Sequence, residues 1–152
     1  MSAPSAAVPS AAKVSAVKEK AKLLSIYSMM ATTAAGSGHP TSCMSAAQLV
    51  AGVFFHAMKF DPKNANSNDA DRFVLSKGHA APVLYAALAE AGVFPVSRLM
   101  TLREFSSELE GHPTPRFMVW TPLRDRSGKA SRWARALRSV RGWIRVRRAS
   151  MC

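Results

Sequence analysis

The sequence predicts a mostly helical chain, and three observations support this. Apolar residues recur at helical spacing in two long segments of the first 60 residues. Only one short apolar run before residue 117, at residues 72–76, suits a buried strand or extended segment. With 48% hydrophobic and 20% charged residues, the 152-residue chain has the composition of about one globular domain, which argues against wholesale disorder.

The first helix is expected at residues 12–33, where an apolar stripe predicts its buried face. The stripe contains Val14, Val17, Ala21 and Leu24, and is widened by Leu23, Ile26 and Met30. Gly36, Ser37 and Gly38 follow and end the helix. Residues 1–12 are rich in Ala, Ser and Pro and lack the apolar core of a secretory signal, so they predict a disordered arm.

A second helix is expected after Pro40, with Thr41 or Ser42 as its N-cap and an end near Phe60. Its predicted buried face contains Leu49, Val50, Val53, Phe54, Ala57 and Met58. Residues 61–71 contain Pro62, three Asn and three Asp, whose side chains compete with helical hydrogen bonds, so this segment predicts a loop.

Two shorter helices are expected after the strand candidate. Pro82 is placed in the first turn of a third helix that runs to Ala91, with Gly92 as its stop. Ser97 is expected to cap a short fourth helix that runs through Phe105.

The net charge of +12 is divided unevenly along the chain. Residues 1–117 carry seven Lys and four Arg against eight acids, a net charge of +3, whereas residues 118–152 carry one Lys and nine Arg against Asp125, a net charge of +9. Only the tail therefore has the charge that indicates a nucleic-acid or membrane-surface partner. Two cysteines form no disulfide framework, and no apolar stretch reaches the roughly 20 residues of a membrane span, so we expect a cytoplasmic protein with no membrane partner.

Three of the four histidines follow a glycine: His39, His79 and His112. Glycine lets the backbone approach a ligand closely, and the proline after His39 and His112 fixes the next φ angle. Any one of them can be a surface-turn histidine, but together they indicate a site that binds anions or moves protons near neutral pH. Their spacing matches no usual zinc pattern, and Cys43 is expected to be a small core residue, so no metal ligand is predicted.

Three sequence blocks carry a family resemblance. They are Ala-Thr-Thr-Ala-Ala-Gly-Ser-Gly-His-Pro-Thr-Ser-Cys at residues 31–43, Asp-Arg-Phe-Val-Leu-Ser-Lys-Gly-His-Ala-Ala-Pro at residues 71–82, and Gly-His-Pro at residues 111–113. Over residues 20–117 the chain resembles the N-terminal segment of transketolases, most closely the animal-type branch. The resemblance implies an α/β thiamine diphosphate-binding fold of transketolase type, present only as a mostly helical N-terminal fragment.

The resemblance also implies an activity and site roles. Transketolases transfer a two-carbon ketol unit between sugar phosphates with thiamine diphosphate and Mg²⁺, in a homodimer whose site lies between two subunits. His39 and His112 match catalytic positions near the substrate, and Ser42, Lys77 and His79 match positions near the cofactor. Ser42 can instead be only a helix cap, and Lys77 only a solvated charge.

Residues 118–152 depart from the family pattern. After Gly-His-Pro the family continues close to Ala-Thr-Gly-Ser-Leu-Gly-Gln-Gly-Leu and later supplies a Gly-Asp-Gly-Glu metal motif, and neither is readable here. The residues from Trp120 onward can be encoded by a choice of synonymous codons that carries a second message. When that DNA is read in a shifted frame, with the last base of each codon joined to the first two bases of the next, it encodes Asp-Thr-Ala-Thr-Gly-Ser-Leu-Gly-Gln-Gly-Leu. We therefore predict an out-of-frame tail after about Phe117, from a frameshift, mis-splicing or a gene-model error.

The predicted layout is a disordered arm at residues 1–12, a partial cofactor-binding domain at 13–117 and a non-homologous arginine-rich tail at 118–152. We expect helix faces that are partly uncovered, weak cofactor binding and no activity for this chain alone. In the alternative, the basic tail binds nucleic acid or an acidic membrane surface, with Trp120, Trp133 and Trp143 available to stack on bases. A separate N-terminal subunit of a split transketolase is also conceivable, but such a subunit should contain the metal motif.

Overall fold

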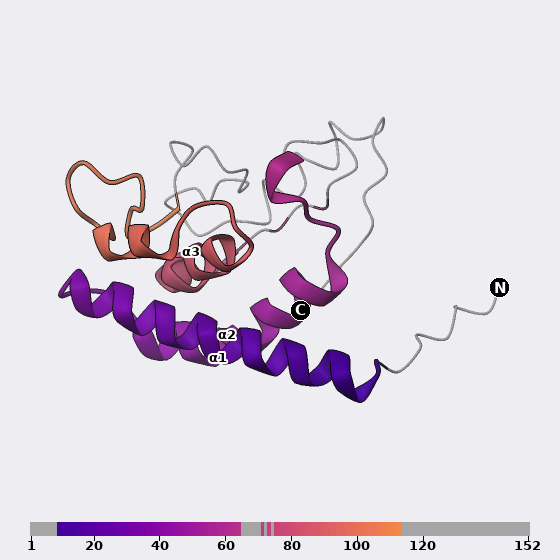
Figure 1. The fold of residues 1–152 in the computed structure, drawn as a ribbon. Coiled ribbons are helices and arrows are strands. Elements are labelled where there is room, and N and C mark those ends of the chain that lie inside the picture. The colour runs from indigo at the N-terminus through magenta and orange to yellow at the C-terminus, as the bar shows by residue number, and fades with distance from the viewer. Residues whose placement is uncertain (1–8, 65–70, 72, 74, 114–152) are drawn as a thin grey trace.

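The computed structural model describes residues 9–64, 71, 73 and 75–113. In these residues the regular structure is helical, and no strand is present. Three α-helices form the body of the fold: α1 (Ala11–Ala34), α2 (Pro40–Gly52) and α3 (Ala81–Glu90) (Figure 1). The arm predicted for residues 1–12 lies outside the described residues up to residue 8, and the tail at 118–152 lies entirely outside them.

Helix α1 begins one residue earlier than expected. Ser10 is its N-cap, and the Ser10 hydroxyl accepts a hydrogen bond of 3.5 Å from the backbone N–H of Lys13. Ala11 and Ala12 therefore belong to the helix and not to a disordered arm. An N-cap serine satisfies one of the backbone donors that a helix leaves without an intrahelical acceptor.

The buried face predicted for α1 is only partly correct. Ala21 and Leu24 are buried, and Val17 packs against the core, but Val14, Ile26 and Met30 are exposed. The rest of the buried face is made of small residues: Ser28, Ala31 and Thr32.

Burial of the Ser28 and Thr32 hydroxyl groups costs little free energy, because each one donates a hydrogen bond to a backbone carbonyl of its own helix. Ser28 donates to the carbonyl of Leu24 at 2.6 Å, and Thr32 donates to the carbonyl of Ser28 at 2.9 Å. Such bonds satisfy the polar groups locally. Helix α1 packs against both α2 and α3. Its buried face combines small side chains with hydroxyl groups that are already hydrogen-bonded.

Helix α2 begins at Pro40, and His39 is its N-cap, so the prediction that Thr41 or Ser42 caps it is wrong. Proline suits the first helical position because it has no N–H to leave unpaired. After Gly52 one π-helical turn, η1 (Val53–Ala57), continues the helical run, which ends three residues before Phe60.

The α2 face also differs in part from the prediction. The core side is formed by Cys43, Ala47, Val50 and Ala51, with Phe54 buried in the turn that follows. Leu49, placed on the buried face by the pattern, is 60% exposed. Cys43 is a fully buried core residue, as expected, and burial raises the pKa of its thiol.

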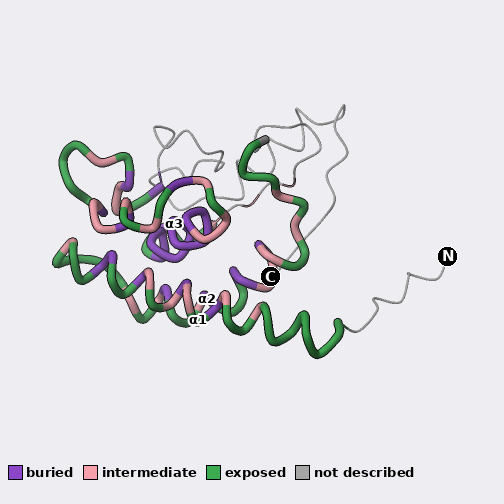
Figure 2. The backbone as a smooth tube through the Cα atoms, viewed as in Figure 1, coloured by how far each residue is buried: buried purple, intermediate pink, exposed green. Residues whose placement is uncertain are grey.

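Helix α3 has Pro82 in its first turn, as predicted, and ends at Glu90, one residue before the predicted Ala91. Ala91 is its C-cap, and Gly92 follows directly. All of its residues except Glu90 are buried. Figure 2 shows this helix as the most continuously buried element, next to the layer formed by α1 and α2. The core of the described region is therefore built around α3.

The last predicted helix is shorter than expected. A 3₁₀-helix, η4 (Val96–Thr101), occupies this region, and Pro95 rather than Ser97 is its N-cap. The predicted end at Phe105 is wrong, because this side chain lies beyond the helix and is fully exposed. The buried residue Leu102 ends the 3₁₀-helix and turns the chain back toward the core.

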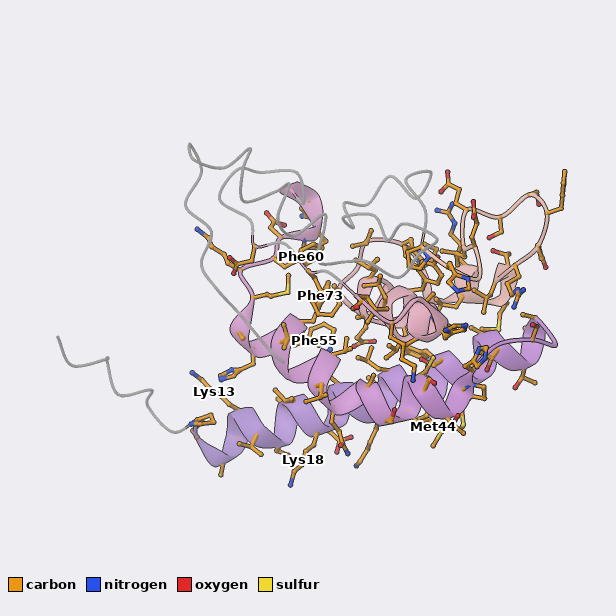
Figure 3. The ribbon with its side chains drawn as sticks, turned by 180° about the vertical axis from the view of Figure 1, so that it is seen from behind. Lys13, Lys18, Met44, Phe55, Phe60 and Phe73 are labelled. Carbon is orange, nitrogen blue, oxygen red and sulfur yellow. The ribbon has the colours of Figure 1, made fainter. Side chains whose placement is uncertain are left out.

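The segment between η1 and α3 contributes an aromatic cluster. The ring centroid of Phe54 lies 4.9 Å from that of Phe60 and 5.9 Å from that of Phe73. Figure 3 shows Phe55, Phe60 and Phe73 on the same side of the molecule, above α1. Part of the predicted 61–71 loop forms a short 3₁₀-helix, η2 (Pro62–Asn64), and the described residues of the strand candidate, at 73, 75 and 76, do not form a strand.

Several large apolar side chains of α1 and α2 are exposed, as expected for partly uncovered helix faces. They are Val14, Ile26, Met29, Met30, Met44 and Leu49. None of the helices in the described part of the chain is long and apolar enough to cross a membrane.

Candidate functional site

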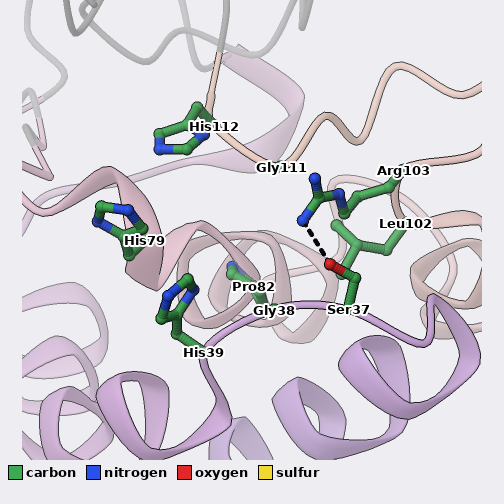
Figure 4. A pocket seen from close by; sticks show the side chains of 9 residues that line it. All are labelled: Ser37, Gly38, His39, His79, Pro82, Leu102, Arg103, Gly111 and His112. Carbon is green, nitrogen blue, oxygen red and sulfur yellow. Dashed lines mark hydrogen bonds between the residues drawn. The ribbon is translucent and has the colours of Figure 1, made fainter.

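The three histidines that follow glycines meet at one place. The ring centroids of His39 and His79 are 4.6 Å apart, and those of His79 and His112 are 5.1 Å apart, both in edge-to-face arrangements. The three residues come from segments separated by 40 and 33 positions in the sequence. Figure 4 shows them around a pocket with Arg103 on its opposite side.

His39 is positioned by the sharp turn between α1 and α2. The preceding Gly38 has a φ of +139°, and a Cβ built on it would lie 2.6 Å from Cγ2 of Thr32. Only glycine fits where the backbone passes so close to α1. The carbonyl of His39 accepts the backbone N–H of Cys43 at 3.2 Å, which makes this histidine part of the start of α2.

His79 is held in a 3₁₀-turn, η3 (Gly78–Ala80), that leads into α3. Its neighbours Gly78 and Ala80 are both buried, whereas His79 itself is exposed. The buried neighbours fix the backbone, so the imidazole is presented at the surface beside the other two rings.

His112 lies on the loop that returns from η4. Tyr85 donates a hydrogen bond of 2.9 Å to the carbonyl of Glu110, two residues before His112. The fully buried Leu109 and the buried Pro113 anchor the loop on both sides. Burial, and secondarily the Glu110 carboxylate, raises the pKa of Tyr85 far above its ordinary range, so this phenol is a neutral hydrogen-bond donor.

Arg103 lines the pocket as well, although the sequence did not indicate it. Its Nη1 donates to Oγ of Ser37 at 2.7 Å. Its backbone has a φ of 65°, the one positive value at a non-glycine residue in the described part of the chain, a conformation that costs about 1–2 kcal/mol for an L-residue. Nothing in the sequence around Arg103 indicates that its side chain reaches Ser37.

The pocket is small and contains no acid. It is lined by Ser37, Gly38, His39, His79, Pro82, Leu102, Arg103, Gly111 and His112. Its volume is about 30 Å³, roughly a tenth of the 300 Å³ at the lower end of typical ligand pockets. Imidazole and guanidinium N–H groups without a carboxylate suit an anionic group.

Two further sequence candidates do not line this pocket. Ser42 is partly buried one turn into α2, where its carbonyl accepts a hydrogen bond from Ser45, and Lys77 is exposed beside η3. Among the described residues, no group of three or more His, Cys, Asp or Glu side chains is arranged to hold a metal ion.

The fold and the site define a helical domain fragment with three histidines on glycine-containing loops around one small pocket. The chain belongs to the family described as the transketolase, thiamine diphosphate binding domain, whose model matches residues 16–119. Transketolase of Mus musculus is 56% identical over 111 residues, a match that covers 71% of this chain and 17% of the mouse protein.

Solved transketolases share the fold as well. A transketolase variant from Pichia stipitis is 31% identical with a TM-score of 0.65, and the match covers 72% of this chain and 16% of that one. Pichia stipitis transketolase in complex with sedoheptulose 7-phosphate is 35% identical with a TM-score of 0.57, over 65% of this chain and 15% of that one. The chain therefore spans about a sixth of the length of these relatives.

Proposed function

We propose that this chain carries the first part of a transketolase cofactor site and is inactive alone. The observation that supports this most is the meeting of His39, His79 and His112 beside Arg103, around an acid-free pocket. A diphosphate group fits this donor set because its oxygens accept hydrogen bonds from imidazole and guanidinium N–H groups.

The roles we propose follow the family pattern. His79 binds the diphosphate, His39 moves a proton beside the substrate carbonyl, and His112 orients the donor sugar phosphate. Ser42 and Lys77 support the cofactor from outside the pocket. When bound, thiamine diphosphate supplies the nucleophilic carbon that a two-carbon transfer requires.

The small pocket explains why we expect weak binding and no turnover from this chain. A volume of about 30 Å³ encloses only a small part of thiamine diphosphate, so the rest of the cofactor needs surfaces from elsewhere. Magnesium does not fit this pocket, because none of the residues that line it offers a carboxylate. We propose that its ligands lie in the family segment that follows Gly-His-Pro.

Calorimetry on the full chain tests this function. Inorganic pyrophosphate should bind in the millimolar range, and His79→Ala should abolish that binding. His56→Ala is the matched control, because His56 is an exposed histidine in η1 that does not line the pocket. Equal pyrophosphate binding by wild type and His79→Ala would contradict the diphosphate role, and tight binding of thiamine diphosphate with Mg²⁺ would contradict the incompleteness of the site.

We further propose the biological setting of the intact family member. It is a cytoplasmic homodimer that uses magnesium with thiamine diphosphate and acts on sugar phosphates in the pentose phosphate pathway. The arginine-rich tail arises from an out-of-frame reading after about Phe117. Sequencing the coding region tests the tail: a shifted frame that does not encode Ala-Thr-Gly-Ser-Leu-Gly-Gln-Gly-Leu and continue into Gly-Asp-Gly-Glu refutes it.

A further inference from the structure

Arg103 contacts two of the three loops that build the histidine site. Its Nη1 donates to Oγ of Ser37, which lies 66 residues earlier and two residues before His39. On the other side, a Cβ built on Gly111 would lie 3.2 Å from both Cζ and Nε of Arg103. The guanidinium therefore lies between the loop that carries His39 and the loop that carries His112, as Figure 4 shows.

The contact with Gly111 depends on both partners. The 3.2 Å from a built Cβ to the guanidinium is closer than an ordinary van der Waals contact, so a side chain at position 111 would push the guanidinium aside by a few tenths of an ångström. Glycine permits the backbone to lie against another group in this way. The absence of a side chain at Gly111 thus leaves the room in which the guanidinium lies.

The backbone of Arg103 is held in an unfavourable conformation by its surroundings. Its N–H donates to the carbonyl of Leu109 at 2.8 Å and closes the turn between Leu102 and Leu109, both of which are buried. A φ of 65° is one that glycine adopts freely and arginine does not. Glycine would make the same backbone bond without strain, so any stabilisation that offsets this cost comes from the arginine side chain.

We propose that Arg103 is a positioning residue for the histidine site: it joins the Ser37 loop to the Gly111 loop and so holds His112 against His79. The contact between His39 and His79 does not depend on this connection, because η3 and α2 pack against each other directly. Tyr85, Leu109 and Pro113 still anchor the His112 loop without the guanidinium. Loss of the guanidinium should therefore let the His112 ring move away from His79 within an anchored loop, and leave His39 and His79 together. This inference concerns the geometry of the three histidines, and it rests on the proposed function only for what that geometry is used to bind.

The test is proton NMR on the full chain, with the nuclear Overhauser effect (NOE) between histidine rings as the readout. The unchanged chain should give NOEs for His39 with His79 and for His79 with His112, since the edge-to-face centroids are 4.6 and 5.1 Å apart. Arg103→Gly relieves the backbone strain while it removes the side chain. We expect the His79 to His112 NOE to be lost, the His39 to His79 NOE to be retained, and the thermal midpoint not to fall.

Two further variants separate the contact from the charge. Arg103→Lys keeps the positive charge without the planar group and should not restore the lost NOE. Gly111→Ala keeps the arginine, displaces its guanidinium, and should weaken the same NOE. Arg98→Ala is the matched control, because Arg98 pairs with Glu108 and lies over Phe94, and its removal should preserve both NOEs.

Several results would overturn the proposal. A His79 to His112 NOE that persists in Arg103→Gly shows that the arginine does not hold His112. Loss of both NOEs together with a lower thermal midpoint shows a general structural role, and rescue by Arg103→Lys shows that charge alone matters. Absence of the His79 to His112 NOE from the unchanged chain also overturns it. None of these readouts uses cofactor or pyrophosphate, so failure of the proposed function leaves this test intact.

Discussion

Substitution of Gly38 by alanine should be among the most damaging single-methyl changes in the chain. The added Cβ would lie 2.6 Å from Cγ2 and 3.3 Å from Cβ of Thr32, and the residue has a φ of +139°. Overpacking costs about 1–3 kcal/mol, and strain at a positive φ adds about 1–3 kcal/mol. We expect Gly38→Ala to lower the free energy of unfolding by about 3 kcal/mol.

A second substitution separates the two costs. Thr32→Ser removes Cγ2 but retains the hydroxyl that donates to the carbonyls of Ser28 and Met29 at 2.9 and 3.0 Å. In the double variant the clash with Cγ2 is removed, whereas the 3.3 Å contact with Cβ and the strain remain. About 1–2 kcal/mol should therefore be recovered relative to the sum of the single changes. A double-mutant cycle gives this interaction energy directly.

Urea unfolding followed by circular dichroism at the helical band measures all four proteins. Gly52→Ala is the control, because Gly52 lies in α2 with nothing within 4 Å of a built Cβ, and alanine should stabilise the helix by about 0.5–1 kcal/mol. If Gly38→Ala is as stable as the unchanged chain, or if Thr32→Ser recovers nothing, the close approach of this turn to α1 is not what requires glycine.

Two other predictions concern the core. Leu24→Ala should lower the free energy of unfolding by about 2–5 kcal/mol, because Leu24 is fully buried. Leu49→Ala should change it by less than about 0.5 kcal/mol, because this side chain is 60% exposed. Equal costs in urea unfolding would contradict this assignment of buried faces. Burial raises the pKa of Tyr85, so the unfolded chain loses this proton first, and stability should be fully present below about pH 10 and fall by up to about 1.4 kcal/mol per pH unit above it. Tyr85→Phe should reduce the slope of unfolding free energy against pH between pH 10 and 12. At pH 7 it should lower the unfolding free energy by about 1 kcal/mol, because the hydrogen bond to the Glu110 carbonyl is lost. An unchanged slope would contradict the role of this phenol.

The sequence predicted the elements that proline and glycine delimit. The boundaries of α3 follow from Pro82 and Gly92, and the turn before α2 follows from Gly38 and Pro40. These residues act through local backbone geometry, which sequence displays directly. The three Gly-His pairs were visible for the same reason, although only the fold brings their rings together.

The buried face of α1 was harder to predict because hydrophobicity was the wrong criterion there. The helix buries Ser28, Ala31 and Thr32 and exposes Ile26 and Met30. Small residues let helices approach closely, and hydroxyl groups that bond to their own helix lose little on burial. Periodicity identifies a helix, but the choice of face depends on which neighbours pack against it.

Arg103 shows a further limit of local reasoning. The contacts of its side chain are made with Ser37 and Gly111. These two residues reach it only after α1 and the 109–112 loop have packed around α3. Neither partner is charged, so no complementary pattern in the sequence points to the pair. The structural sign is instead a cost, a φ of 65° at a residue that is not glycine. Such a cost persists only when the surrounding contacts determine the conformation, and here the contacts in question join two of the loops that carry the histidines.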